Sequence, residues 1–332
     1  MEKSVDISVH REKAFQRINE MHEKYGHFPI LEHYPKKGSD WFYTHPSPFL
    51  HANVLYSLLN SGSIVPNTVI VGAGKFLWEF KEIGNIWRFW KNHESTNPVL
   101  CGTEDTAISS IVLEKLGYTL KNKEKLVNRI KTDGSLYTWI VADKKLLFND
   151  VKAYLWLKYN DRPAKDTIQR GYMSLIDSEP TITATVISYL GENEQTHKTI
   201  NYLKSAWDSW EKPFTGVYDY YEQKIVFAFH IARAYKEGCL TLKDLLHPIV
   251  EYIDKEYERF EFAELLIAYL SLTYYQCEHY LLDILKGKIL SEISVREAYF
   301  DHYKYISSND REYFGGSNVL TAAWFLETTN NW

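Results

Sequence analysis

The stretch Gly102-Thr103-Glu104-Asp105-Thr106-Ala107-Ile108-Ser109 carries the pattern that decides the fold. Two adjacent carboxylates come first, small residues follow, and the positions up to Leu116-Gly117 are mostly apolar. Acids in a first turn and a glycine after the last turn are ordinary signals of helix ends. Because the small and apolar residues are not confined to one face, we expect a helix that is buried on all sides.

The same pattern returns in Ser178-Glu179-Pro180 to Leu190-Gly191, and looser versions recur along the chain. The segments of this first kind are Phe49–Leu59, Asp105–Leu116, Asp150–Tyr159, Thr181–Leu190, Lys224–Tyr235, Phe262–Leu272 and Asn318–Leu326. More charged segments alternate with them, most with a single apolar face, near 68–82, 122–131, 163–175, 195–207, 241–256 and 278–289. An α/α toroid requires this alternation, because inner helices line its axis and half-exposed outer helices cover the gaps.

The sequence therefore predicts an all-α fold, an (α/α)6-like toroid in one domain over residues 1–332. Its repeat spacing of about 30–55 residues is uneven, which favours a divergent barrel over a tandem solenoid. Residues 1–47 are expected to form an N-terminal helix, from about Ser4 to Tyr25, and an aromatic-rich covering loop. The stretch 135–148 favours a short β-hairpin with its turn at Ala142-Asp143-Lys144-Lys145.

Composition and charge exclude several classes of function. The net charge is −5 and no basic face or tail is present, so we expect no nucleic-acid partner. Cys101, Cys239 and Cys277 are widely spaced and indicate neither a disulfide framework nor a structural zinc site. No apolar run approaches the roughly 18–20 residues that span a bilayer, and residues 1–20 do not resemble a signal peptide. We expect a reduced, cytoplasmic protein without a cofactor; peripheral membrane contact and homo-oligomerisation stay open.

Aromatic residues are unusually frequent, at 15% of the chain, and several lie close in sequence to the two carboxylates. A carboxylic acid beside aromatic faces can generate and stabilise a carbocation, with roughly 0.5–2 kcal/mol from each desolvated ring. The candidate substrate-binding rings are Trp87, Phe89, Trp90, Tyr137 and Trp139. The alternative for each of them is structural, because a barrel of this size needs large residues to fill it.

Three motifs resemble those of class II terpene cyclases, the squalene–hopene and copalyl diphosphate synthase type. Glu104-Asp105-Thr106-Ala107 is similar to the family's Asp-x-Asp-Asp-Thr-Ala motif, and Lys131-Thr132-Asp133-Gly134-Ser135 to its Gln-x-x-Asp-Gly-Ser turn. The stretch 314–323, Phe-Gly-Gly-Ser-Asn-Val-Leu-Thr-Ala-Ala, is similar to the opening of the last inner helix. The resemblance implies a cavity for an apolar isoprenoid, with Glu104 as the acid that protonates a double bond or epoxide and Asp105 as the residue that orients it.

The chain also departs from that family. In the cyclase motif three aspartates act together, whereas here Gly102 takes the first position and Glu104 the middle one. No DDxxD cluster that would ionise a diphosphate is present, and the length leaves no room for a second toroid. Enzymatic activity therefore stays open. The leading hypothesis is a protonation-initiated terpene cyclase; the alternatives are a non-catalytic lipid-binding toroid and a carbohydrate-active (α/α)6 enzyme.

The polar candidates also have structural explanations. Thr103 is a candidate N-cap, with Glu104 and Asp105 as first-turn partners of the helix dipole. Glu261 and Glu264 could pair as acid and base, but a helix start explains them as well. Asp150 is interpreted as an N-cap and Asp219 as an acid in a solvated loop. His51 and His230 are interpreted as hydrogen-bonded core histidines.

Overall fold

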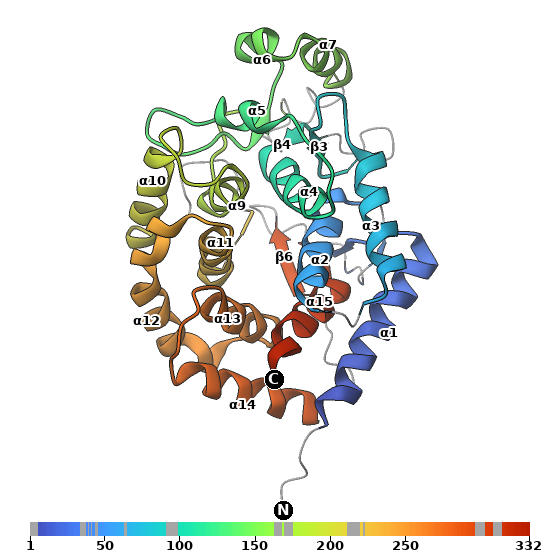
Figure 1. The fold of residues 1–332 in the computed structure, drawn as a ribbon, viewed down its shortest axis with the longest axis vertical. Coiled ribbons are helices and arrows are strands. Elements are labelled where there is room, and N and C mark those ends of the chain that lie inside the picture. Colours follow the sequence, from blue (N-terminus) through green and yellow to red (C-terminus); the bar gives the residue numbers. More distant parts are fainter. Residues whose placement is uncertain are drawn as a thin grey trace, which may run out of the picture.

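In the computed structural model the described residues are 6–33, 38, 40, 42–43, 46–62, 65–90, 99–162, 168, 175–210, 220–221, 223–295, 303–307 and 314–332. Within them, a set of inner helices forms a closed ring (Figure 1). They are α2 (Pro48–Asn60), α4 (Thr103–Lys115), α9 (Pro180–Leu190), α11 (Lys224–Lys236), α13 (Phe262–Tyr274) and α15 (Asn318–Thr328). Each packs against the next in this order, and α15 packs against α2 to close the ring.

The inner helices are buried on all sides, as their sequences predict. Every residue of α9 and of α15 is buried, and burial in α4 runs without interruption from Thr103 to Leu113. Such helices have no polar face to turn toward water, so a position inside the ring is the only stable one for them. The Thr, Ala and Ser residues between the larger ones let neighbouring helices approach closely.

The outer helices each bury one face against the ring. They are α1 (Ile7–Tyr25), α3 (Asn67–Phe80), α5 (Lys123–Val127), α10 (His197–Asp208), α12 (Leu246–Glu256) and α14 (Leu281–Val295). In α14 the buried residues recur every four positions, at Leu281, Leu285, Ile289 and Ile293. The N-terminal helix α1 packs on α15, and α3 covers the gap between α2 and α4. The predicted all-α toroid of alternating inner and outer helices is confirmed for the described residues.

Of the 3-10 helices in the described residues, two lie between inner and outer helices and one follows α15. The 3-10 helices are η2 (Leu240–Leu245), η3 (Tyr257–Arg259) and η4 (Thr329–Asn331). Within the described parts, no helix combines the length and apolar character needed to cross a membrane.

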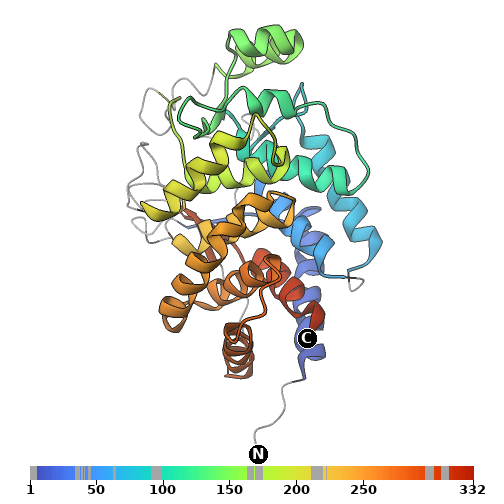
Figure 2. The ribbon, with the colours of Figure 1, turned by 60° about the vertical axis from the view of Figure 1, so that its left-hand side comes forward.

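One predicted inner helix is wrong. Residues 150–159 form α7 (Val151–Asn160), which with α6 (Lys144–Asn149) protrudes from the ring (Figures 1 and 2). Only Ala153 and Leu157 of α7 are buried, because α4 packs directly on α9 and leaves no inner position between them. The segment 163–175, expected to be a half-exposed helix, lies almost entirely outside the described residues.

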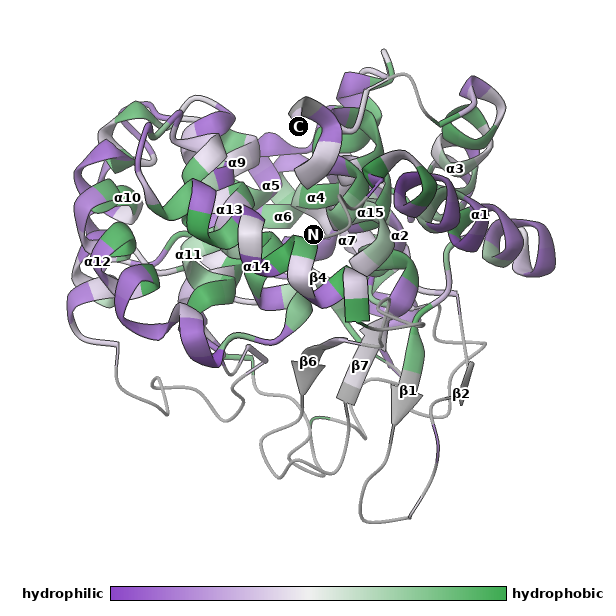
Figure 3. Cartoon of the chain, turned by 90° about the horizontal axis from the view of Figure 1, so that it is seen from below, coloured by the Kyte–Doolittle hydropathy of each residue, from purple (hydrophilic) through white to green (hydrophobic). Residues whose placement is uncertain are grey.

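Short strands form two antiparallel sheets. One has the order β3 (Trp87–Arg88), β4 (Cys101–Gly102), β5 (Trp139–Ile140). The other has the order β2 (Phe42–Tyr43), β1 (Leu31–His33), β7 (Phe314–Ser317), β6 (Tyr303–Ser307) and lies on one side of the ring (Figure 3). Strand β4 runs directly into α4, and β7 into α15, so both sheets lie at the N-terminal ends of inner helices.

The short β structure expected near 135–148 is present as β5. Its partner is β4, with Ile140 opposite Cys101, and not residues 145–148. The residues expected to form the hairpin turn begin α6 instead, because the carboxylate of Asp143 accepts a hydrogen bond from the Leu146 N–H at 2.9 Å. A side chain that caps a helix start in this way favours the helix over a turn.

Candidate functional site

Glu104 lies in the first turn of α4 and contacts side chains from α9, from α11 and from the segment before α11. Its side chain is buried, and its Oε1 accepts a hydrogen bond of 2.8 Å from the Thr185 hydroxyl of α9. Its Oε2 accepts one of 2.7 Å from the hydroxyl of Tyr221, three residues before α11. Burial raises the pKa of Glu104 to about 7, although these two hydrogen bonds and the charge of Arg233 lower it. A group with this pKa is present as acid and as carboxylate near neutral pH.

The interpretation of Thr103 as the N-cap is wrong. The N-cap position belongs to Gly102, and the Thr103 hydroxyl instead donates to the carbonyl oxygens of Tyr137 and Thr138, at 3.2 and 3.1 Å. Glu104 is therefore not one of a capped pair at an exposed helix start. Its carboxyl points to side chains from the neighbouring inner helices.

The guanidinium of Arg233 is a buried cation next to this site. Arg233 of α11 donates from Nη2 to the Thr185 hydroxyl at 3.1 Å and to Nδ1 of His230 at 2.9 Å, and from Nη1 to Asn53 at 2.9 Å. Burial, and then the charge of Arg233, hold the pKa of His230 well below its ordinary value. The 3.8 Å between His230 Nδ1 and Glu104 Oε1 therefore joins a neutral imidazole to the carboxyl and is not an ion pair. His230 is a hydrogen-bonded core histidine, but one at the edge of the candidate site.

Asp105 explains the glycine before it. Its carboxylate occupies the space into which a Cβ on residue 102 would project, so only glycine fits at that position. Burial, and then the charge of Glu104, raise the pKa of Asp105 well above its ordinary value. Gly102 is thus a consequence of where the Asp105 side chain packs, and the neighbouring Glu104 favours the protonated state of Asp105.

The sequence analysis did not identify two further acids at this end of the ring as site residues. Glu179, the N-cap of α9, accepts a hydrogen bond of 3.0 Å from the Ile182 N–H. Burial raises the pKa of Glu179 to about 8; the Ile182 N–H lowers it, and the charge of Glu104 raises it further. Asp177 is also buried. The signal for Glu179 was the shared acidic start of the two aligned segments, because α4 and α9 turn out to be neighbours.

The five predicted aromatic residues do not form one wall. The indole N–H of Trp87 donates to the Leu77 carbonyl of α3 at 2.9 Å, which turns this ring toward the outer helices. Phe89 packs against Trp90 and, at 5.6 Å between ring centroids, against Phe49 of α2. The two remaining rings are separate: Tyr137 lies under the ammonium group of Lys131, and Trp139 donates to Asp177 Oδ2 at 3.5 Å.

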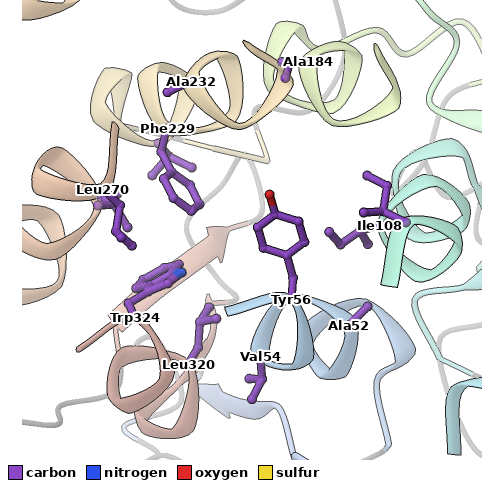
Figure 4. Packing of buried hydrophobic residues seen from close by; sticks show 14 of the residues in the cluster. Ala52, Val54, Tyr56, Ile108, Ala184, Phe229, Ala232, Leu270, Leu320 and Trp324 are labelled. Carbon is purple, nitrogen blue, oxygen red and sulfur yellow. The ribbon is translucent and has the colours of Figure 1, made fainter. Parts of the chain in front are cut away.

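Other aromatic rings occupy the interior of the ring of helices. Tyr56, Phe229 and Trp324 are fully buried and point toward one another from α2, α11 and α15 (Figure 4). Phe229 and Trp324 meet edge to face at 5.9 Å, and the ring of Tyr221 lies 5.5 Å from that of His230. These residues are far from Glu104 along the chain, so proximity in sequence does not point to them.

Two motifs behind the family resemblance have structural roles. Asp133 accepts hydrogen bonds from the backbone and hydroxyl of Ser135, at 3.0 and 2.8 Å, and closes the turn at Gly134. Gly134 has φ +93 and lies against the backbone carbonyl of Lys198, so no side chain fits there. Ser317 caps α15 by accepting from the N–H groups of Val319 and Leu320.

The remaining candidates that lie in the described residues have structural roles. Glu261 and Glu264 form a capping box at the start of α13, and Asp150 caps α7. His51 accepts from the Phe28 N–H at 3.0 Å and bonds to the Ala73 carbonyl at 3.0 Å. Asp219 lies outside the described residues. Across the described part of the chain, no group of three or more His, Cys, Asp or Glu residues could hold a metal ion.

Comparison with known proteins supports the fold alone. No model of a protein family matches the chain, and no curated protein matches it. A crystal structure of a protein from Actinoplanes is similar, with a TM-score of 0.58 and 11% sequence identity, over 96% of this chain and 98% of that chain. The toroid of this protein is therefore shared, over nearly its whole length, with a distant structural neighbour.

Proposed function

We propose that the protein is a general-acid enzyme that binds an apolar isoprenoid inside the ring and starts its cyclisation by protonation from Glu104. The observation that carries the proposal is the buried carboxyl of Glu104, whose pKa burial raises to about 7. A general acid works best when its pKa lies near the working pH, because it then holds its proton and still releases it.

The hydrogen bonds around Glu104 fit a group that gives up a proton. When the Thr185 hydroxyl donates to Oε1, that oxygen only accepts, and the acid proton resides on Oε2, 2.7 Å from the Tyr221 hydroxyl. After proton transfer, Thr185 and Tyr221 both donate to the new carboxylate. Arg233 donates to the Thr185 oxygen and so supports this arrangement. Two donors already in position lower the cost of forming the negative charge.

The interior of the ring suits an apolar substrate that becomes cationic. The rings of Tyr56, Phe229 and Trp324 point into it (Figure 4), and Tyr221 contacts Glu104 directly. An aromatic face within about 6 Å stabilises a desolvated cation by about 2 kcal/mol. The three free cysteines, of which Cys101 and Cys239 are buried, suit the reducing cytoplasmic location that belongs to this proposal.

A product assay tests the acid. The protein is incubated with squalene, a polyprenol and a polyprenyl diphosphate, and the extracts are analysed for cyclised products. We expect a product with the wild type and a loss of about 10²–10⁴-fold in rate with Glu104→Gln, which keeps the shape of the side chain but has no acidic proton. Glu264→Gln, at the helix cap of α13, is the matched control and should retain activity. An unchanged rate with Glu104→Gln would contradict the assignment of Glu104 as the general acid.

Two further measurements, of the melting temperature and of oligosaccharide hydrolysis, separate the two alternatives. A lipid-binding toroid without chemistry predicts that isoprenoids raise the melting temperature equally in the wild type and in Glu104→Gln, with no product from either. A carbohydrate-active enzyme is favoured by Asp177, whose Oδ2 lies 3.5 Å from both Trp139 Nε1 and the Tyr220 hydroxyl. Glycoside hydrolysis depends on carboxyl groups, so hydrolysis of an oligosaccharide that Asp177→Asn abolishes would establish that alternative.

A further inference from the structure

The helix pair α6–α7 protrudes from the ring (Figure 2), and several of its large apolar side chains are exposed to solvent. The exposed fractions are 53% for Val151, 46% for Leu155 and 60% for Tyr159, and these residues follow one another at four-residue steps as an apolar strip along one face of α7. Phe148, at the end of α6, is 85% exposed. Large apolar side chains gathered on a protruding element mark an interaction surface more often than single ones do.

The ring uses only the opposite face of α7. Ala153 and Leu157 are buried against the body of the protein, and Trp156 lies between, with the Arg88 guanidinium 5.2 Å from its ring. The helix is therefore apolar on two faces, of which the fold covers one. This is why its sequence resembles that of an inner helix.

The charges of this segment are sorted by direction. Its three acids face the body, where Asp143 pairs with Arg129, Asp150 with Lys125 at 3.1 Å, and Asp161 with Arg88 at 2.7 Å. Its basic side chains are all exposed, at Lys144, Lys145, Lys152, Lys158 and Arg162, and the Arg162 guanidinium lies 5.2 Å from the ring of Tyr159 in the apolar strip. Five basic and three acidic residues give the segment 143–162 a net charge of +2, within a chain of net charge −5. The face turned to solvent is thus apolar in the middle and positive at its edges.

We propose that this face of α6–α7 docks on a lipid bilayer that contains anionic headgroups. The apolar strip enters the boundary between headgroups and acyl chains, and the surrounding basic residues contact lipid phosphates. With ten residues, about 15 Å, α7 lies along the surface and does not span the bilayer. A second copy of the chain is a poorer occupant, because two such faces would bring lysines against lysines.

Vesicle binding tests this surface without reference to Glu104. The full-length protein is sedimented with vesicles of phosphatidylcholine alone and of phosphatidylcholine mixed with phosphatidylglycerol. We expect at least about tenfold stronger partitioning to the anionic vesicles, and weaker partitioning as salt is raised, because exposed charges are screened. Equal partitioning to both kinds of vesicle, or none to either, would overturn the proposal.

Two variants and their matched controls locate the contact. Phe148→Ser/Leu155→Ser/Tyr159→Ser should weaken partitioning by about tenfold or more, since each buried apolar group contributes to anchoring. Lys144→Glu/Lys145→Glu/Lys152→Glu should remove the preference for anionic lipid. Because it changes only exposed side chains, it tests the proposal even if the serine variant unfolds. Val71→Ser/Leu240→Ser, at sites 58% and 65% exposed elsewhere on the protein, should bind like the wild type, as should Lys13→Glu/Lys198→Glu/Lys243→Glu.

Two further outcomes would assign the face differently. Wild-type partitioning by the serine variant would show that another surface contacts the lipid. A dimer in solution that the serine variant dissociates, without binding of either protein to vesicles, would show that the face belongs to a second copy of the chain. Either result overturns the proposal.

Discussion

The two ends of the inner ring carry the same pair of groups in different electrostatic surroundings. At the N-terminal end the Tyr221 hydroxyl donates to Glu104 at 2.7 Å. At the C-terminal end Tyr56 donates to Glu237 at 2.7 Å, and Tyr274 to Glu327 at 2.6 Å. In each pair a carboxyl accepts a short hydrogen bond from a tyrosine of another part of the ring; Glu104 and Glu327 are buried and Glu237 is half-buried.

The difference is a lysine. Lys115 lies 3.0 Å from Glu237, and Lys236 lies 3.4 Å from Glu327. Among the described residues, the link from Arg233 to Glu104 runs through the Thr185 hydroxyl. A cation in contact opposes the effect of burial on the pKa of a carboxyl, and Lys236 does so at Glu327, although burial still raises the pKa of Glu327 above its ordinary value. The two ends therefore differ in the cation that contacts the carboxyl and not in the tyrosine that donates to it.

The largest expected effect is that of removing the cation shared by the two ends. Arg233 lies 5.4 Å from the Tyr56 ring on one side and donates to Thr185, His230 and Asn53 on the other. Arg233→Met should lower the free energy of unfolding by about 3–5 kcal/mol, because three buried acceptors lose their partner. Urea unfolding measures it. Arg259→Met, on an 82% exposed side chain, is the control and should change stability by less than about 0.5 kcal/mol. An Arg233→Met loss below about 1 kcal/mol would contradict this account.

The next prediction concerns how the free energy of unfolding depends on pH through Glu104. The pKa of Glu104 in the folded state, about 7, lies above its unfolded value, so the native state binds more protons between the two. The stabilising contribution is complete below the unfolded pKa and is lost as pH rises through about 7. Over this window the wild type should lose up to about 3 kcal/mol from this group, and Glu104→Gln should flatten that part of the curve. Parallel curves of unfolding free energy against pH for the two proteins would rule out a raised pKa.

A smaller effect tests how Asp105 packs. Gly102→Ala places a Cβ where the Asp105 carboxylate lies and should cost about 1–3 kcal/mol. The double variant Gly102→Ala/Asp105→Ala should recover part of this loss, because the clash is removed. Gly287→Ala, on an open face of α14, is the matched control and should stabilise by about 0.5–1 kcal/mol. Additive losses in the double variant would place the carboxylate elsewhere.

The smallest effect is expected at the rim of the C-terminal end. The side chain of Lys115 is 36% exposed, so water partly replaces it as the partner of Glu237. Lys115→Met should lower the free energy of unfolding by only about 0.5 kcal/mol. Thermal unfolding, with Tyr56→Phe measured in parallel, gives the comparison. A loss above about 2 kcal/mol would mean that this ion pair behaves as a fully buried one.

Much of the fold is visible in the sequence, because burial leaves a local periodic trace. The segments containing Thr181–Leu190 and Asn318–Leu326 are apolar all round and are inner helices. The same rule failed for Asp150–Tyr159. A helix that is apolar on two faces must be covered by something, but its own sequence does not say whether the cover is the rest of the chain.

The candidate site was predictable in its position but not in its composition. Glu104 and Asp105 were identified from their place at a helix start, whereas Tyr221 and Thr185, the groups that contact Glu104, come from distant parts of the chain. The aromatic residues predicted from their proximity in sequence do not form one wall; the indole N–H of Trp87, for example, donates to the Leu77 carbonyl of an outer helix. Proximity along the chain is a poor guide here, because every inner helix contributes to the same interior.

The sequence by itself determined the alternation of inner and outer helices and the location of two acids at one helix start. Both depend on properties of short segments: composition, periodicity and helix-end chemistry. Only the tertiary structure decided that Glu104 is an acid with a pKa near 7, while Glu237 and Glu327 lie beside lysines. The pKa of a buried carboxyl depends on desolvation and on partners from other helices, and those are set only when the ring closes.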